Sequence, residues 1–107
     1  MDTLRILIVE ILNELNYQLR ATDDGQEKKE IRRLKKILWM LLEDVIEQEL
    51  DKNSQTYKDA IEALERADKD AKRATLDIKK CSESLNSIVD AIKILEKVVG
   101  TTIGIFT

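Results

Sequence analysis

The second half of the chain carries a single apolar repeat, which we call the heptad seam, from Tyr57 to Val99. Its steps alternate between three and four residues, so every member falls on one side of an α-helix. The repeat continues for about six heptads, more than the three or four that indicate a coiled-coil or bundle helix. Its members are Tyr57, Ala60, Leu64, Ala67, Ala71, Ala74, Ile78, Cys81, Leu85, Ile88, Ile92, Leu95 and Val99.

Two further helices are predicted before the seam, over about Thr3–Ala21 and about Gln26–Leu50, because apolar residues recur there at helical spacing. Polar turn residues separate the segments, and Ser54 is the predicted N-cap of the third. Gly100 stands where a left-handed residue ends a helix. Proline is absent and only 3 glycines occur, so few positions force a helix to stop. The predicted fold class is all-α, with a helical bundle over residues 1–100 and a short apolar tail over 101–107.

The arrangement of the third segment has two alternatives. One helix of about 43 residues would span about 65 Å, pack on the antiparallel hairpin of the first two helices, and project beyond it. A turn near Lys79–Ser84, with Ser82 or Ser84 as cap, would instead give a four-helix up-down bundle. Matched helix lengths favour the turn. The unbroken seam and the lack of glycine or proline favour the long helix, which is our first expectation.

The second predicted helix has more apolar surface than one core can cover. It is apolar nearly all round over residues 37–42, which is typical of a buried helix. Trp39, Met40 and Ile46 point about 80–160° away from the stripe that Leu34 and its neighbours form. Another part of this chain, a second copy or a partner must cover these side chains. We therefore predict an interface that contains Trp39, Met40, Ile46 and Leu50.

The charges of this helix run against its dipole. A helix favours acidic residues at its start and basic residues at its end, yet here the first half is basic and the second half is acidic. Neighbouring helices could supply counter-charges. A small anionic, phosphorylated ligand could bind the basic cluster, or a second copy could pair antiparallel with the same helix. The candidate anion-binding residues are Lys28, Lys29, Arg32, Arg33 and Lys36.

Several function classes lose support from composition. Histidine is absent, which removes the commonest general base and metal ligand. We therefore expect no enzyme activity, no metal site and no cofactor. The net charge of −3 and the pI near 5.1 argue against binding to duplex nucleic acid. Cys81 lies on the seam, where we expect a buried small side chain, with a symmetric intermolecular disulfide as the alternative. Glutamate pairs at helical spacing, among them Glu10 with Glu14, are predicted to be solvated.

The sequence thus favours a non-enzymatic interaction or regulatory protein that acts as a homo-oligomer or docked on a larger partner. We expect it in the cytoplasm, because Asp2 and Glu10 do not fit a signal peptide and no apolar run approaches a membrane span. One alternative is a membrane-active bundle that uses residues 92–107. The other is a module that binds small anionic ligands through the Lys28–Lys36 cluster.

Overall fold

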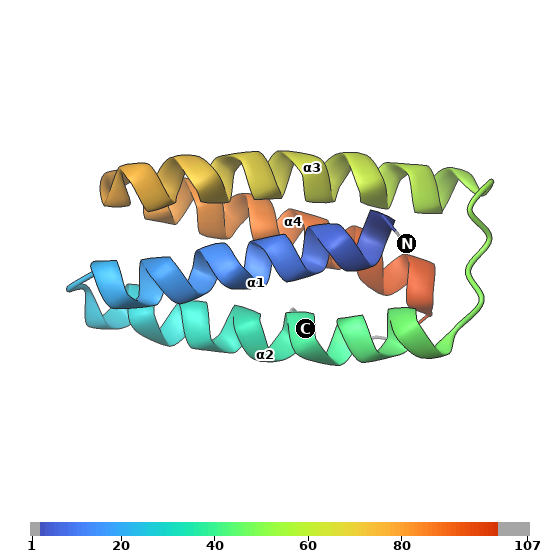
Figure 1. Ribbon diagram of the computed structural model, residues 1–107, viewed down its shortest axis with the longest axis horizontal. Coiled ribbons are helices and arrows are strands. Elements are labelled where there is room, and N and C mark those ends of the chain that lie inside the picture. Colours follow the sequence, from blue (N-terminus) through green and yellow to red (C-terminus); the bar gives the residue numbers. More distant parts are fainter. Residues whose placement is uncertain (1–2, 101–107) are drawn as a thin grey trace.

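The structure is a computed structural model that describes residues 3–100, and these fold into helices joined by short turns and one longer loop (Figure 1). The predicted all-α class is confirmed. Helix α1 has the predicted bounds, and α2 ends three residues before the predicted Leu50. The elements are α1 (Thr3–Ala21), α2 (Gly25–Glu47), α3 (Gln55–Leu76), the 3-10 turn η1 (Ile78–Lys80) and α4 (Cys81–Val99).

The expected long helix is wrong and the four-helix alternative is confirmed for the described residues, because the chain turns back between α3 and α4. Asp77 leaves helical geometry, with φ −142° and ψ 99°, and its side chain accepts a hydrogen bond from the Lys79 backbone N–H. Asp77 therefore caps the turn, rather than Ser82 or Ser84. An unbroken helix of about 65 Å would far exceed the longest dimension of the molecule, 40 Å. Turning back lets both halves of the heptad seam share one core.

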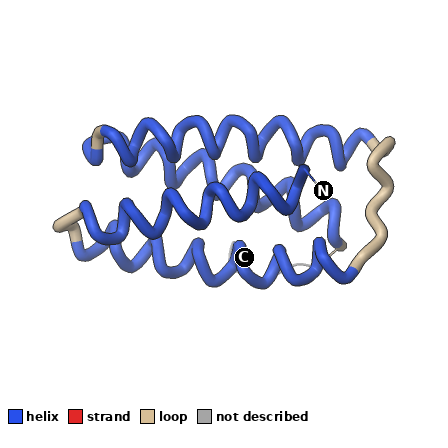
Figure 2. The backbone as a smooth tube through the Cα atoms, viewed as in Figure 1, coloured by secondary structure: helices blue, strands red, loops and turns tan. Residues whose placement is uncertain are grey.

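The four helices alternate in direction, but their spatial order differs from their chain order (Figure 1). Helix α1 packs against α2 and α3, and α4 packs against the same two helices. Helices α2 and α3 therefore lie diagonally opposite, although they are consecutive in the chain. The loop over residues 48–54 joins them across one end of the bundle, and it is the longest connection in Figure 2.

The heptad seam lines this core on both sides of the turn. All of its members are buried except Ile78, which is half-buried. Two predicted helix boundaries are confirmed by their hydrogen bonds and backbone angles. The Ser54 hydroxyl accepts from the Tyr57 backbone N–H at 3.1 Å, and Gly100 ends α4 with φ 70°. The seam thus keeps its phase through Asp77, so α3 and α4 both face the interior.

Candidate interaction surface

The outer side of α2 exposes large apolar side chains. Trp39, Met40 and Ile46 are 54%, 44% and 53% exposed, respectively. Among the described helices, each packs mainly against two others, so one face of every helix points outward. The expectation that α2 is buried over residues 37–42 is therefore wrong for Trp39 and Met40, although Ile37 and Leu42 are buried. No part of residues 3–100 covers these three exposed side chains.

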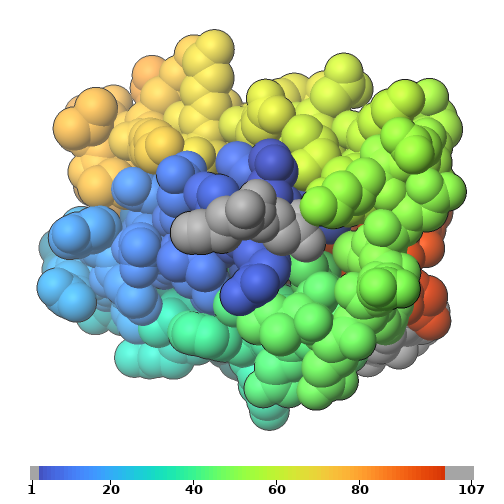
Figure 3. All heavy atoms as spheres, turned by 45° about the vertical axis from the view of Figure 1, so that its right-hand side comes forward, coloured from blue at the N-terminus to red at the C-terminus, as the bar shows by residue number. Residues whose placement is uncertain are grey.

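A shallow groove of about 310 Å³ runs between α1 and α2, and Ile46 is the member of this exposed group that lines it. Figure 3 shows the two helices side by side on this part of the surface. Ile6 and Val9, which lie off the apolar stripe of α1, are both exposed. Trp39 lies seven residues before Ile46, and hence on the same side of α2. The groove is lined by Arg5, Ile6, Val9, Glu10, Leu42 and Ile46.

Leu50 does not belong to this surface. It follows the end of α2, in the loop that crosses the bundle end, and is half-buried against the core. Nearby, the Gln48 side-chain amide donates to the Val99 backbone carbonyl at 3.1 Å, which ties the end of α2 to the end of α4. The predicted interface therefore divides into three exposed residues and one that contributes to folding.

The basic cluster lies along α2 and makes almost no ion pairs with other described residues. Lys29, Arg32, Arg33 and Lys36 are exposed, and Lys28 is half-buried. In the described part of the chain, the cluster makes one ion pair, from Arg33 to Glu30 of the same helix. No ion pair within residues 3–100 joins α2 to another helix. Neighbouring helices therefore do not neutralise α2 by direct ion pairing.

A carboxylate of the same chain already occupies the N-terminus of α2. The Asp24 carboxylate accepts from the backbone N–H groups of Gln26 and Glu27, at 2.8 Å and 3.2 Å. These are the donors that a phosphate would use at a helix start. The neighbouring hollow between α2 and α4 is lined by Glu27 and Glu30 among others, so its own carboxylates oppose an anionic ligand. Anion binding by the cluster stays a prediction without a shaped pocket to support it.

The apolar C-terminal segment is part of the core as far as the structure describes it. Ile92, Leu95 and Val99 are buried between the helices, so they contact a membrane only if α4 leaves the bundle. The remainder of the predicted segment, 101–107, lies outside the described residues. Among the described helices, none has the length and apolar content needed to cross a membrane.

A buried carboxylate between α1 and α3 is a feature that helical periodicity did not predict. Asp68 is buried, and the Lys72 ammonium lies 2.9 Å from one of its oxygens and 3.3 Å from a Glu10 oxygen. The other Asp68 oxygen is buried without a hydrogen-bond partner. Burial, followed by the nearby Glu10 carboxyl, raises the pKa of Asp68 to about 6, while Lys72 opposes the rise. Glu10 is thus part of a polar contact, and not simply a solvated residue.

A second feature that the sequence did not reveal is a hydrogen-bonded side chain in the core, near the bundle end that holds the turn between α3 and α4. Gln18 is fully buried, donates to the Ala71 carbonyl at 3.0 Å, and accepts from the Cys81 thiol at 3.7 Å. It therefore links α1 to α3 and α4.

Cys81 is buried as predicted, and burial raises the pKa of its thiol to about 11, with smaller effects from Glu27 and Asp24. A fully buried thiol cannot form the alternative intermolecular disulfide without opening the bundle.

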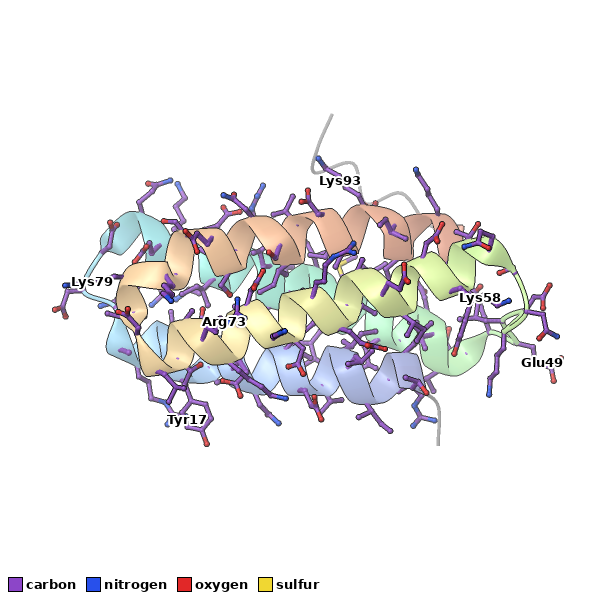
Figure 4. The ribbon with its side chains drawn as sticks, turned by 90° about the horizontal axis from the view of Figure 1, so that it is seen from above. Tyr17, Glu49, Lys58, Arg73, Lys79 and Lys93 are labelled. Atoms are coloured by element: carbon purple, nitrogen blue, oxygen red, sulfur yellow. The ribbon has the colours of Figure 1, made fainter. Side chains whose placement is uncertain are left out.

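The Asp68 cluster joins one ammonium to two carboxylates. The groove between α1 and α2 adjoins this cluster at Glu10, and its lining is otherwise mainly apolar. Within residues 3–100, no three side chains of the metal-binding types gather closely enough to hold an ion. The exterior is mainly charged and polar, as Figure 4 shows for Arg73, Lys79 and Lys93. The exposed apolar surface of α1 and α2 is therefore the strongest candidate site.

Comparison with protein families, characterised proteins and solved structures finds no match to this chain. Function is therefore inferred from the surface and its chemistry alone.

Proposed function

We propose that the protein is a non-enzymatic interaction or regulatory module, which acts as a homo-oligomer or docked on a larger protein through the outer surface of α1 and α2. The observation that carries this proposal is the exposure of Trp39, Met40 and Ile46 on the outer side of α2, with an apolar groove beside Ile46. Tryptophan and methionine are enriched at protein interfaces, and a buried tryptophan often dominates the binding energy. A clustered apolar surface is also more informative than single exposed residues.

Site-specific photo-crosslinking tests this proposal. A photoreactive residue is placed at position 46 in the groove, and in a control variant at position 62, where Glu62 is exposed on α3. Both variants are irradiated in the cells that naturally produce the protein. We expect a crosslinked protein product from position 46 and none from position 62. Equal yields at both positions, or no product from either while both variants stay folded by circular dichroism, would remove the support for this surface.

A further inference from the structure

The proposed function does not say which partner binds, and the charges of α2 point to one. Resting on that proposal, we infer that the surface binds a second copy of this chain, with α2 antiparallel to α2 of the partner about a two-fold axis between Trp39 and Met40. Six exposed residues carry this pairing, and we call them the α2 outward face: Arg32, Lys36, Trp39, Met40, Glu43 and Glu47.

These six residues form one narrow face. At 100° per residue they fall within an arc of about 100°, centred opposite the buried stripe. Their order along the helix is symmetric about the point between Trp39 and Met40, while exposed Lys29, which falls on the same arc, has no counterpart within α2. Basic residues precede that point by the same number of positions as glutamates follow it. In an antiparallel pair Arg32 therefore meets Glu47 of the partner copy, and Lys36 meets Glu43.

The residues level with the two-fold axis are apolar, and the pairs before and after them along the helix are opposite in charge. Trp39 and Met40 are consecutive, so they lie about 100° apart at the two edges of this face. The two-fold axis therefore brings each of them beside its own counterpart in the second copy. Parallel pairing would instead place basic beside basic and acid beside acid. Such like-charge contacts select against the wrong orientation. The face therefore specifies a second copy, and also its direction.

The charges of this face are available for such a partner. None of Arg32, Lys36, Glu43 and Glu47 makes an ion pair within the described residues. No opposite charge lies three or four positions from Lys36 along the helix, so the helix itself cannot neutralise it. Segregating the charges into two blocks runs against the helix dipole. An antiparallel copy compensates both blocks together.

The available area predicts a weak, reversible dimer. A typical stable interface takes about 800 Å² from each partner, roughly an eighth of the 6461 Å² surface of this chain. One helix of 23 residues, about 35 Å long, supplies less than that without its neighbours. Ile6 and Val9 beside the groove extend the apolar area toward α1. We therefore expect a micromolar dissociation constant, of the order found for small interfaces.

Sedimentation velocity and Trp39 fluorescence measure the association directly. Trp39 is the only tryptophan in the chain and is 54% exposed, so its emission should shift to shorter wavelength as the dimer forms. Purified protein is compared from about 1 to about 500 μM, a range chosen around a micromolar constant. We expect a shift from monomer to dimer, weakened by added salt because exposed charges are screened.

Charge exchange tests the antiparallel register. The acidic-face variant carries Arg32→Glu and Lys36→Glu, and the basic-face variant carries Glu43→Lys and Glu47→Lys. Each alone should dimerise at least about tenfold more weakly, because like charges then face each other. Their equimolar mixture should form a heterodimer, since every pair is again opposite. The fourfold variant, which keeps the wild-type net charge, should regain the homodimer. Lys58→Glu with Lys69→Glu on α3 is the matched control, and both lysines are exposed.

The experiments distinguish failure of the second-copy inference from failure of the proposed function. A protein that stays monomeric at every concentration, yet crosslinks from position 46 to another protein, overturns the second copy and leaves the proposed function intact. A dimer that ignores charge exchange but is lost in Trp39→Ala overturns the antiparallel register while the surface still binds. A monomer that gives no crosslinked product overturns both. Circular dichroism of each variant confirms that the helical fold is kept.

Discussion

Asp68 has the most strongly altered chemistry of any described carboxyl group, and this alteration affects the free energy of unfolding. Its pKa is raised to about 6 in the folded protein, above the usual 3.8. The folded state therefore binds a proton more tightly than the unfolded chain does. This contributes stability that is fully present below about pH 4, and that stability is lost as the pH rises through about 6. Glu10 acts in the opposite direction, because its pKa is lowered, but only near and below the ordinary glutamate value of 4.5.

We therefore expect the wild-type protein to gain about 1–2 kcal/mol of unfolding free energy as the pH falls from 7 to 5. Asp68→Asn, which carries no titrating proton, should lose most of this gain. Urea titrations at several pH values measure both profiles. Asp90→Asn is the control, because Asp90 is exposed on α4. Identical pH profiles for wild type and Asp68→Asn would show that the Asp68 proton does not contribute.

Cys81 is expected to be chemically inert while the bundle is folded. It is fully buried, and the pKa of its thiol is raised to about 11, so the reactive thiolate is scarce at pH 8. Modification by a thiol reagent should be at least about a hundredfold slower in the native protein than in urea, because it requires opening of the bundle. A native rate equal to the unfolded rate would mean that the thiol is reachable from solvent.

At the scale of the elements, two isoleucines provide a matched comparison between core and surface. Ile92 of α4 is fully buried, whereas Ile46 of α2 is 53% exposed. Ile92→Ala should cost about 2–5 kcal/mol of unfolding free energy, through lost burial and the cavity left behind. Ile46→Ala should cost less than about 1 kcal/mol in the monomer, yet weaken association. Chemical denaturation at low protein concentration separates the two effects, and equal costs would contradict the assignment of core and surface.

The helices themselves could be predicted because the apolar spacing is regular. Matched helix lengths indicate a turn between α3 and α4 only as an alternative, near Lys79–Ser84, and do not place it at Asp77. The heptad seam runs from Ala74 through Ile78 to Cys81 without a change of phase, and no glycine or proline marks the break. Local sequence is equally consistent with a straight helix there. The turn depends on nonlocal burial, since both halves of the seam need the stripes of α1 and α2. The polar contacts of Gln18 and Asp68 also depend on nonlocal packing, so periodicity alone did not reveal them.

At the scale of the whole molecule, the exposed surface was predictable in part. The position of Trp39, Met40 and Ile46 off the main stripe follows from helical geometry, and their exposure agrees with it. Leu50 was misplaced because α2 ends at Glu47, before the helical spacing would have brought it to this face. The basic cluster was identifiable by charge. The absence of ion pairs between this cluster and other described helices depends on how those helices pack, so it could not be predicted from the sequence.

Self-association through this surface should make thermal stability depend on protein concentration. If folded chains dimerise, mass action stabilises them, so we expect the melting temperature to rise by about 5 °C over a hundredfold increase in concentration. Trp39→Ala should melt at nearly the same temperature as dilute wild type and show little dependence on concentration. Calorimetry of both proteins over that range makes the comparison. A concentration-independent melt for wild type would argue against a folded dimer.

The uninterrupted seam through Asp77 has a consequence for assembly errors. Straightening the short hinge between α3 and α4 would join them into one continuous rod without moving any apolar residue out of phase. Two such open chains could exchange their last helices, and each core would be rebuilt from the same residues that fill it in the monomer. Domain swapping of this kind needs little more than a hinge that tolerates both shapes. The turn at Asp77 thus separates two assemblies that share a single hydrophobic pattern.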